Sequence, residues 1–253
     1  MGFSFHGKSS TSMGIPTRMS VENRIPEIRN ATDTIEGRHG IVDFGETLSE
    51  RKIEISCFIP PGKTDRDLLE LKDKIVDWLN PDHGLCPLIL DREPGRQYYA
   101  RLEEGLSFEK MIRNTGTFNL TFFCPDPFGY AIEDEIFTLT ESTTIRRTKG
   151  NVVSHPVYEI RGAISDKRNS ITFTVNGEKV TICGPLAASE VLYLDTDDMT
   201  ARIVTQAGEQ RNALGNMFDF HFPYLTMGEN TVELGTNGGT FTSLIVHAKS
   251  RWL

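Results

Sequence analysis

The sequence is poor in the residues from which several classes of site are built. It contains four cysteines and two tryptophans among 253 residues. The cysteines are widely spaced, and three of them lie in strand-like runs: Cys57, Cys86, Cys124 and Cys183. This spacing favours buried, reduced thiols over a disulfide framework or a metal site. We therefore predict no cofactor and no bound metal.

Long apolar runs are missing as well. The longest, such as 88–90 and 244–246, are far shorter than the ~20 residues that a membrane-spanning helix needs. The first residues, Met1 to His6, contain neither a basic region nor an apolar core, so no secretory signal is visible. We expect a protein that is made in a cytosol and does not insert into a membrane.

An excess of positive charge is also absent, because the formal net charge is −8. Net basic charge favours the binding of phosphates, so specific nucleic-acid binding is not predicted. The chain also lacks the common catalytic motifs, including G-x-S-x-G, H-E-x-x-H, a phosphate-binding glycine loop and a dinucleotide fingerprint. Its six histidines are scattered, with none four residues from another.

Two acidic clusters have simple structural interpretations. Asp195-x-Asp197–Asp198 lacks the glycine and the distal glutamate of a calcium loop, so a turn is favoured there. Glu103 and Glu104 are adjacent, and adjacent residues of a strand face opposite ways, so they cannot act as a glycosidase pair on one sheet face. Together with the missing motifs, these observations predict that the chain is not an enzyme.

The first half contains one convincing helix among several strands. Apolar residues recur at helical spacing over 65–79, after a sequence, Thr64-x-x-Asp67, that resembles a capping box. Residues 52–59 alternate between Ile53, Ile55 and Cys57 on one face and polar residues on the other, which is typical of a strand. Further strands are predicted at 87–91, 97–103, 106–110 and 117–123.

The segment 15–42 lacks a core-facing pattern and is rich in charged residues and threonine. A loose loop of this length is unusual inside a compact domain. Such a segment is either a flexible surface loop or an arm that becomes ordered against a partner.

The second half is plainly all-β. The tract 124–130 carries two prolines and a glycine and marks a boundary. We divide the chain into a domain over 1–131, a connecting segment over 132–148 and a second domain over 149–253. In the latter, short alternating strands and the Asn176–Gly177 hairpin turn predict a sandwich or jelly roll.

A β-sandwich also suggests carbohydrate binding, for which aromatic side chains, tryptophan above all, form the platforms. Trp78 lies on the apolar stripe of the predicted helix, and Trp252 is next to the C-terminus. Tyr193 and Tyr224 remain as candidate platforms. The alternative prediction is therefore a carbohydrate-binding adhesin module.

Four tracts, in this order and spacing, resemble a known family. They are 3–5, with a polar segment behind it; 124–129; 150–162; and 222–232, with Ser250–Leu253 at the end. With the single helix, they make the chain similar to the distal tail proteins (Dit) of long-tailed phages with non-contractile tails, chiefly those that infect Gram-positive bacteria.

The resemblance implies a mainly β fold: an N-terminal β-sandwich with one helix and an extended hairpin arm, then a C-terminal jelly roll similar to galectins or carbohydrate-binding modules. It implies six copies in a ring at the virion tail tip, assembled in the host cytoplasm. This ring would join the tail tube protein, the tape-measure protein and the tail-associated tip protein. DNA would cross its channel without specific binding, which suits an acidic chain.

The resemblance also implies that the arm, assigned to 15–42, embraces the neighbouring subunit. The residues assigned to this subunit interface are Ile15, Arg18, Val21, Asn23, Arg24, Ile25, Ile28, Ile35 and Ile41. The chain lacks the His-Asn-Pro-Arg type of sugar signature found in galectins. Under the adhesin alternative, the C-terminal domain would instead recognise the host cell wall.

Overall fold

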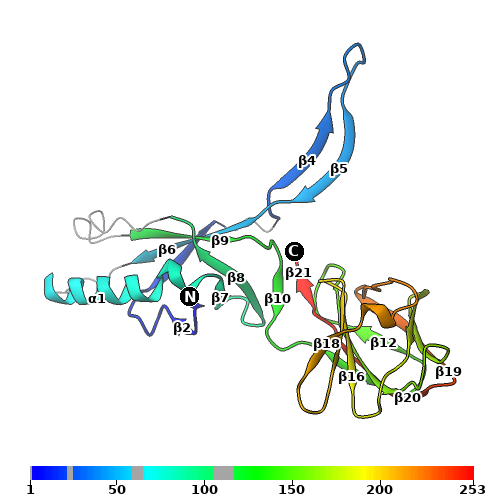
Figure 1. The fold of residues 1–253 in the computed structure, drawn as a ribbon. Helices are drawn as coiled ribbons and strands as arrows, with labels where there is room; N and C mark the ends of the chain where they lie inside the picture. The colour runs from blue at the N-terminus through cyan, green and yellow to red at the C-terminus, as the bar shows by residue number, and fades with distance from the viewer. Residues whose placement is uncertain (1, 22–24, 59–64, 105–116) are drawn as a thin grey trace. The chain divides into compact units, whose positions relative to one another are not determined.

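A computed structural model of the chain describes residues 2–21, 25–58, 65–104 and 117–253 (Figure 1). The chain divides into two compact units, Met1–Gly129 together with Leu253, and Tyr130–Trp252. Antiparallel strands dominate both units, as the sequence predicts. The mainly β fold class is confirmed.

One sheet forms the body of the first unit. Its strand order is β2 (Lys8–Ser9), β1 (Phe3–Phe5), β7 (Cys86–Leu90), β8 (Arg96–Leu102), β9 (Thr117–Cys124), β6 (Arg51–Phe58) and β3 (Thr17–Val21). The predicted strands at 52–59, 87–91, 97–103 and 117–123 all form, with ends shifted by one residue. The strand predicted at 106–110 lies outside the described residues.

The core of the first unit lies against helix α1 (Asp65–Trp78), which follows the predicted boundaries closely. Leu71, Ile75 and Trp78 are buried at helical spacing. The aromatic rings of Phe5 in β1 and Phe122 in β9 lie 5.1 Å apart, although two strands separate β1 from β9 in the sheet. The sheet therefore curves over this core. Thr64 of the predicted capping box lies outside the described residues.

A two-stranded hairpin, β4 (Ile28–Asp33) with β5 (Val42–Leu48), forms a sheet of its own. The arm assigned to 15–42 was therefore placed too early in the chain. Ile15 is buried and packs in the core of the first unit, and β3 is a regular strand of its sheet. The sequence pattern did not reveal the burial of Ile15 or the strand β3, because a single core residue followed by an edge strand gives little apolar periodicity.

The second unit is a sandwich of two antiparallel sheets. One has the order β11 (Ile136–Leu139), β20 (Thr240–His247), β13 (Val157–Ala163), β16 (Val191–Asp195), β17 (Thr200–Val204) and β18 (Gln210–Asn212). The other has the order β12 (Thr143–Arg147), β19 (Gly228–Asn237), β14 (Ser170–Val175) and β15 (Glu178–Cys183). The predicted turn between β14 and β15 has positive φ at both Asn176 and Gly177.

The remaining short elements are the 3₁₀ helices η1 (Pro81–His83) and η2 (Leu214–Asn216), and the strands β10 (Gly129–Ala131) and β21 (Arg251–Trp252), which pair with each other.

The segment 132–148 is not a connection, contrary to our prediction. It supplies β11, which pairs with β20, and β12, which pairs with β19. Each is an edge strand with few buried apolar residues, such as Leu139 and Ile145. Strands so sparsely apolar do not show the alternation that identifies a strand in a sequence.

Candidate assembly interface

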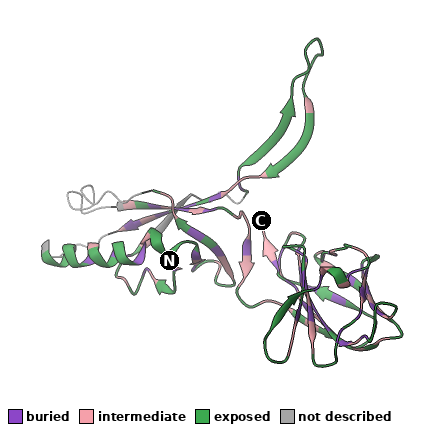
Figure 2. Cartoon of the chain, in the orientation of Figure 1, coloured by how far each residue is buried: buried purple, intermediate pink, exposed green. Residues whose placement is uncertain are grey.

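The β4–β5 hairpin, from here on called the arm, carries large apolar side chains that the described residues of its own chain leave exposed. Every residue of β4 is exposed, and so are all residues of β5 except Val42 and Leu48 at its ends (Figure 2). The exposed apolar residues of the arm and the segment before it are Ile25, Ile28, Ile35, Ile41 and Phe44, at 46–69% exposure. Exposed apolar surface of this kind marks interaction sites.

Local sequence explains why a hairpin forms here. Between the strands, Gly37 and Gly40 both adopt positive φ, which glycine reaches without the steric cost of a side chain. Asp33 accepts a hydrogen bond from the amide of Thr34 at 2.8 Å, an arrangement that favours a turn. The turn therefore brings β4 and β5 together without any help from a core.

The base of the arm is tied to the first unit. The amide of Ser49 donates to the carbonyl oxygen of Glu27 at 2.8 Å, which closes the hairpin. Two residues further on, Arg51 is only 6% exposed, and its Nε donates to the carbonyl oxygen of Pro127 at 2.7 Å. Its guanidinium also lies 5.6 Å from the ring centre of Tyr98, within the range of a cation–π contact. The arm therefore leaves the core from a fixed point.

The structure separates the predicted interface residues into three groups. Ile25, Ile28, Ile35 and Ile41 are exposed on the arm or next to it. Ile15 is buried in its own core and is not available to a neighbour. The last group is not described well enough to place: Arg18 and Val21 belong to β3, with undescribed side chains, while Asn23 and Arg24 lie outside the described residues.

Sequence reasoning missed the second strand of the arm. Phe44 is the most exposed of the large apolar residues of the arm, at 69%, and lies beyond the predicted boundary at residue 42. Its strand reads Val42-x-Phe44-x-x-x-Leu48, in which Gly45 interrupts the alternation. The signal that could have identified it is the pair of glycines, Gly37 and Gly40, which centre a hairpin near residue 38 rather than 28.

In the second unit, the two predicted sugar platforms, Tyr193 and Tyr224, lie in different surroundings. Tyr193 lies on β16, and the guanidinium of Arg202 lies 5.4 Å from its ring centre. Tyr224 is 44% exposed and lies outside regular strands. Glu159, which is paired with Tyr193 on the neighbouring strand β13, is 6% exposed. Arg161 and His247 hold its carboxylate, the latter at 3.5 Å.

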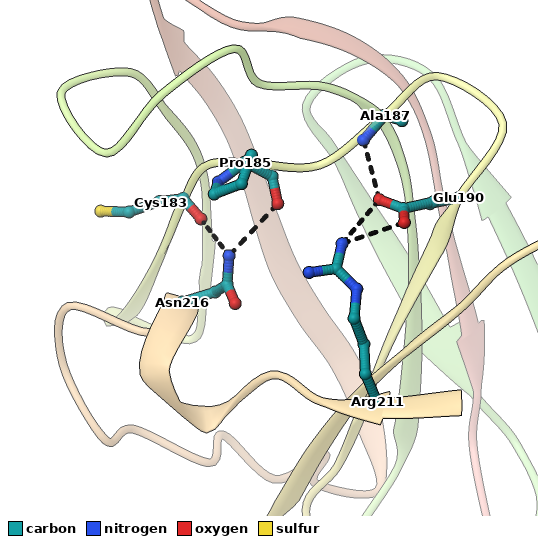
Figure 3. Close-up of polar contacts among 6 residues, drawn as sticks. All are labelled: Cys183, Pro185, Ala187, Glu190, Arg211 and Asn216. Atoms are coloured by element: carbon teal, nitrogen blue, oxygen red, sulfur yellow. Dashed lines mark hydrogen bonds and ion pairs between the residues drawn. The ribbon is translucent and has the colours of Figure 1, made fainter. Parts of the chain in front are cut away.

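A hollow of about 410 Å³ lies in the second unit. Its lining is mostly small or apolar: Ala163, Ile164, Ser165, Pro185, Leu186, Ala187, Gly238 and Thr240. One wall is held by polar contacts (Figure 3). Asn216 donates to the carbonyl oxygens of Cys183 and Pro185, at 2.9 and 3.4 Å, and Glu190 accepts from the amide of Ala187 and from Arg211.

Among the described residues, no group of three or more His, Cys, Asp or Glu side chains has the arrangement of a metal site. No helix in the described part of the chain is long and apolar enough to cross a membrane. Burial raises the pKa of the Cys57 and Cys124 thiols to about 12. These two thiols therefore stay protonated at neutral pH and are poor nucleophiles.

Comparison with known proteins gives the family context of this arrangement. Residues 8–124 match the sequence profile of the phage tail protein RIFT-related domain. This segment is similar to the phage tail RIFT-related domain. It includes the arm and ends at the last residue of β9. None of the curated protein sequences compared with the chain matches it.

Solved structures extend the likeness beyond this domain. The Dit protein of phage SPP1, described as a paradigm of hub adsorption apparatus in Gram-positive infecting phages, is similar with a TM-score of 0.73 at 19% identity. The match covers 100% of this chain and 99% of the SPP1 chain. The whole chain therefore has the Dit fold, and the resemblance stated from the sequence is confirmed.

Two phage P2 baseplate structures in the activated conformation, with Ca and with Sr, match with a TM-score of 0.45 each, at 11% and 12% identity. They cover 100% and 98% of this chain, and 99% of each matched chain. The phage tail domain and the Dit fold support a structural role in a phage tail.

Proposed function

We propose that the chain is a tail-tip hub protein, six copies of which close into a ring through their arms. The observation that carries the proposal is the arm itself, a hairpin with large apolar side chains exposed on both strands. A single two-stranded hairpin is marginally stable at best in water, because it buries too little surface. An arm of this kind gains order by docking on a partner.

The apolar residues of the arm determine how much free energy docking contributes. Full burial of an isoleucine or phenylalanine side chain contributes roughly 1.5–3 kcal/mol. About half of each of the four exposed side chains of the arm, and of Ile25 just before it, is accessible, so docking recovers on the order of 1 kcal/mol from each. A second copy of the chain is the partner that we propose. Contact between an arm and a different surface on the next copy is heterologous, and such contacts close into rings when the rotation allows it.

In this proposal the first unit forms the ring, and the second unit is carried by it. The ring joins the tail tube protein to the tape-measure protein and the tail-associated tip protein, at the tip of the virion tail after assembly in the host cytoplasm. DNA crosses the ring without specific binding. The net charge of −8 supports this part, since an acidic wall repels phosphates.

The test is to remove the arm without disturbing the fold. The amide of Ser49 and the carbonyl of Glu27 are hydrogen-bonded at 2.8 Å, so a two-glycine turn can replace residues 28–48 between them. This replacement retains Ile15 and β3, which belong to the core and its sheet. We expect rings from the intact chain and folded monomers from the arm-less chain, by native mass spectrometry. Rings formed without the arm would overturn the proposal.

The second candidate function is carbohydrate binding by the second unit. The observation that favours it is the outer face around Tyr193, where an aromatic ring adjoins Glu159, Arg161 and Arg202. Binding to purified host cell wall by the full chain, lost in Tyr193→Ala or Tyr224→Ala, would support this function. Because Arg202 lies over the Tyr193 ring, Arg202→Ala should strengthen binding if Tyr193 is the platform. Unchanged binding in all three variants would exclude these platforms.

A further inference from the structure

The arm contains a one-residue irregularity in its ladder. Ile28 and Asn30 lie opposite Leu48 and Glu46, whereas the next pairs are Thr32 with Asp43 and Asp33 with Val42. One residue, Ala31, therefore opposes two residues, Phe44 and Gly45. This is the arrangement of a β-bulge on β5.

Local chemistry stabilises the bulge. Gly45 has φ of 100°, a conformation that residues with side chains rarely adopt. Its amide donates a hydrogen bond to Oδ1 of Asp43 at 2.9 Å, so a side chain two residues away fixes the local backbone. A Cβ at this position would meet nothing within 4 Å. The need for glycine here therefore comes from the backbone conformation and not from crowding.

The bulge changes which side chains share a face. Residues directly opposite each other point to the same face, and residues along a strand alternate. Ile28 and Leu48 therefore share one face of the arm. Val42 pairs with Asp33, five residues after Ile28, and lies on the other face. In a ladder that kept Gly45 but had no bulge, Val42 would lie on the same face as Leu48, so the bulge distributes the apolar side chains over both faces.

A bulge also bends its strand and increases the local twist. The two strands of the arm curve together (Figure 1). An arm that joins one copy to the next transmits any change in its bend to the rotation between them. That rotation decides whether heterologous contacts close, and after how many copies.

We propose that the bulge at Phe44–Gly45 determines the closure of the ring. This inference rests on the proposed function, since it assigns a geometric role to the arm that links the copies. Without the bulge the arm still docks on the next copy, but successive copies then meet at a different angle.

The test is deletion of Gly45, which removes the extra residue and lets β5 pair with β4 in one continuous register. We expect the variant to associate, but as open chains or as rings with a copy number different from that of the intact protein. Native mass spectrometry gives the copy number, and negative-stain electron microscopy separates open from closed forms. Gly45→Ala, which keeps the length but opposes the positive φ, should give a mixture of these forms and the original ring.

Two controls carry the same backbone penalty elsewhere. Gly208→Ala, in the second unit, and Gly14→Ala, in the first unit outside the arm, also place alanine at positive φ with nothing within 4 Å. Both should keep the original copy number. Original rings from the Gly45 deletion would overturn the inference, and so would monomers, because the bulge would then serve docking itself. Neither result touches the proposed function, which fails only if the intact chain forms no ring or the arm-less chain still does.

Discussion

The indole Nε1 of Trp78 donates a hydrogen bond to the backbone carbonyl oxygen of Phe5 at 2.8 Å, and both residues are buried. The bond joins the last turn of α1 to β1, 73 residues earlier in the chain. The Trp78 ring also stacks on Phe3, with ring centres 5.3 Å apart. A single side chain therefore fixes the helix against the strand that begins the fold.

Trp78→Phe should destabilise the first unit by about 2–4 kcal/mol. The phenyl ring cannot donate, so the buried carbonyl of Phe5 loses its partner at a cost of about 1–3 kcal/mol, and the smaller ring leaves a void. Urea unfolding followed by circular dichroism measures the loss. Val76→Ala, on the exposed side of the same helix, should change the free energy of unfolding by less than ~0.5 kcal/mol. Equal effects of the two changes would contradict the role given to Trp78.

Gly162→Ala should destabilise the second unit by about 1–3 kcal/mol through overpacking. A Cβ there would lie 2.3 Å from the carbonyl oxygen of Thr240 and 2.6 Å from Cδ1 of Ile171. Gly162 follows a register shift between β13 and β20, where the two backbones approach closely. The control is Gly215→Ala, where a Cβ meets nothing within 4 Å. Thermal unfolding of both variants tests the difference, and an unchanged midpoint for Gly162→Ala would show that the strands separate freely.

Trp78 and the Asn176–Gly177 turn illustrate what the sequence could and could not predict. Trp78 belongs to an apolar stripe with helical spacing, so its burial was predictable. Its bond to Phe5 was not, because local periodicity carries no information on contacts between residues distant in the chain. Asn176 and Gly177 were predictable because their turn depends only on local backbone preferences.

The arm was only partly predictable for a related reason. The arm is almost entirely exposed, so no buried face imposes an apolar alternation on its sequence. Neither its ends nor its second strand could therefore be recognised from the sequence pattern. The exposed Ile28, Ile35 and Ile41 were identified, while Ile15 was assigned to the same surface although it packs inside. An isolated isoleucine has the same sequence signal in both places, and only the fold distinguishes them.

The buried thiols predict a loss of stability at alkaline pH. Burial raises the pKa of Cys57 and Cys124 from 9.0 to about 12, so folding favours the protonated thiol. This stabilisation is fully present below pH 9, where unfolded thiols are also protonated, and is lost as the pH rises from 9 towards 12. A double Cys57→Ala, Cys124→Ala variant should be less stable at pH 7 but lose less of its stability over this range. A loss as steep as that of the intact chain would assign the alkaline sensitivity to other groups.

The same burial predicts selective alkylation. At pH 8, iodoacetamide should modify the half-buried Cys183 before Cys57 and Cys124, because the buried thiols are both protonated and inaccessible. Mass spectrometry of peptides from the native protein gives the order. In urea all three should react at similar rates, which controls for differences between the peptides. Early modification of Cys124 in the native protein would show that the first unit opens locally.

Phe44→Asp tests whether the apolar side chains of the arm act in assembly. Phe44 is 69% exposed, so its replacement should leave the free energy of unfolding within about 0.5 kcal/mol of the original. If the side chain is buried against a second copy, the change removes an apolar contact and places a charge in the interface. A cost of at least 1.4 kcal/mol then weakens association about tenfold or more. Met199→Asp introduces the same charge at a 62% exposed position of the second unit and should leave association unchanged. Sedimentation over a concentration series compares the two, and equal behaviour would mean that Phe44 stays in water when the copies assemble.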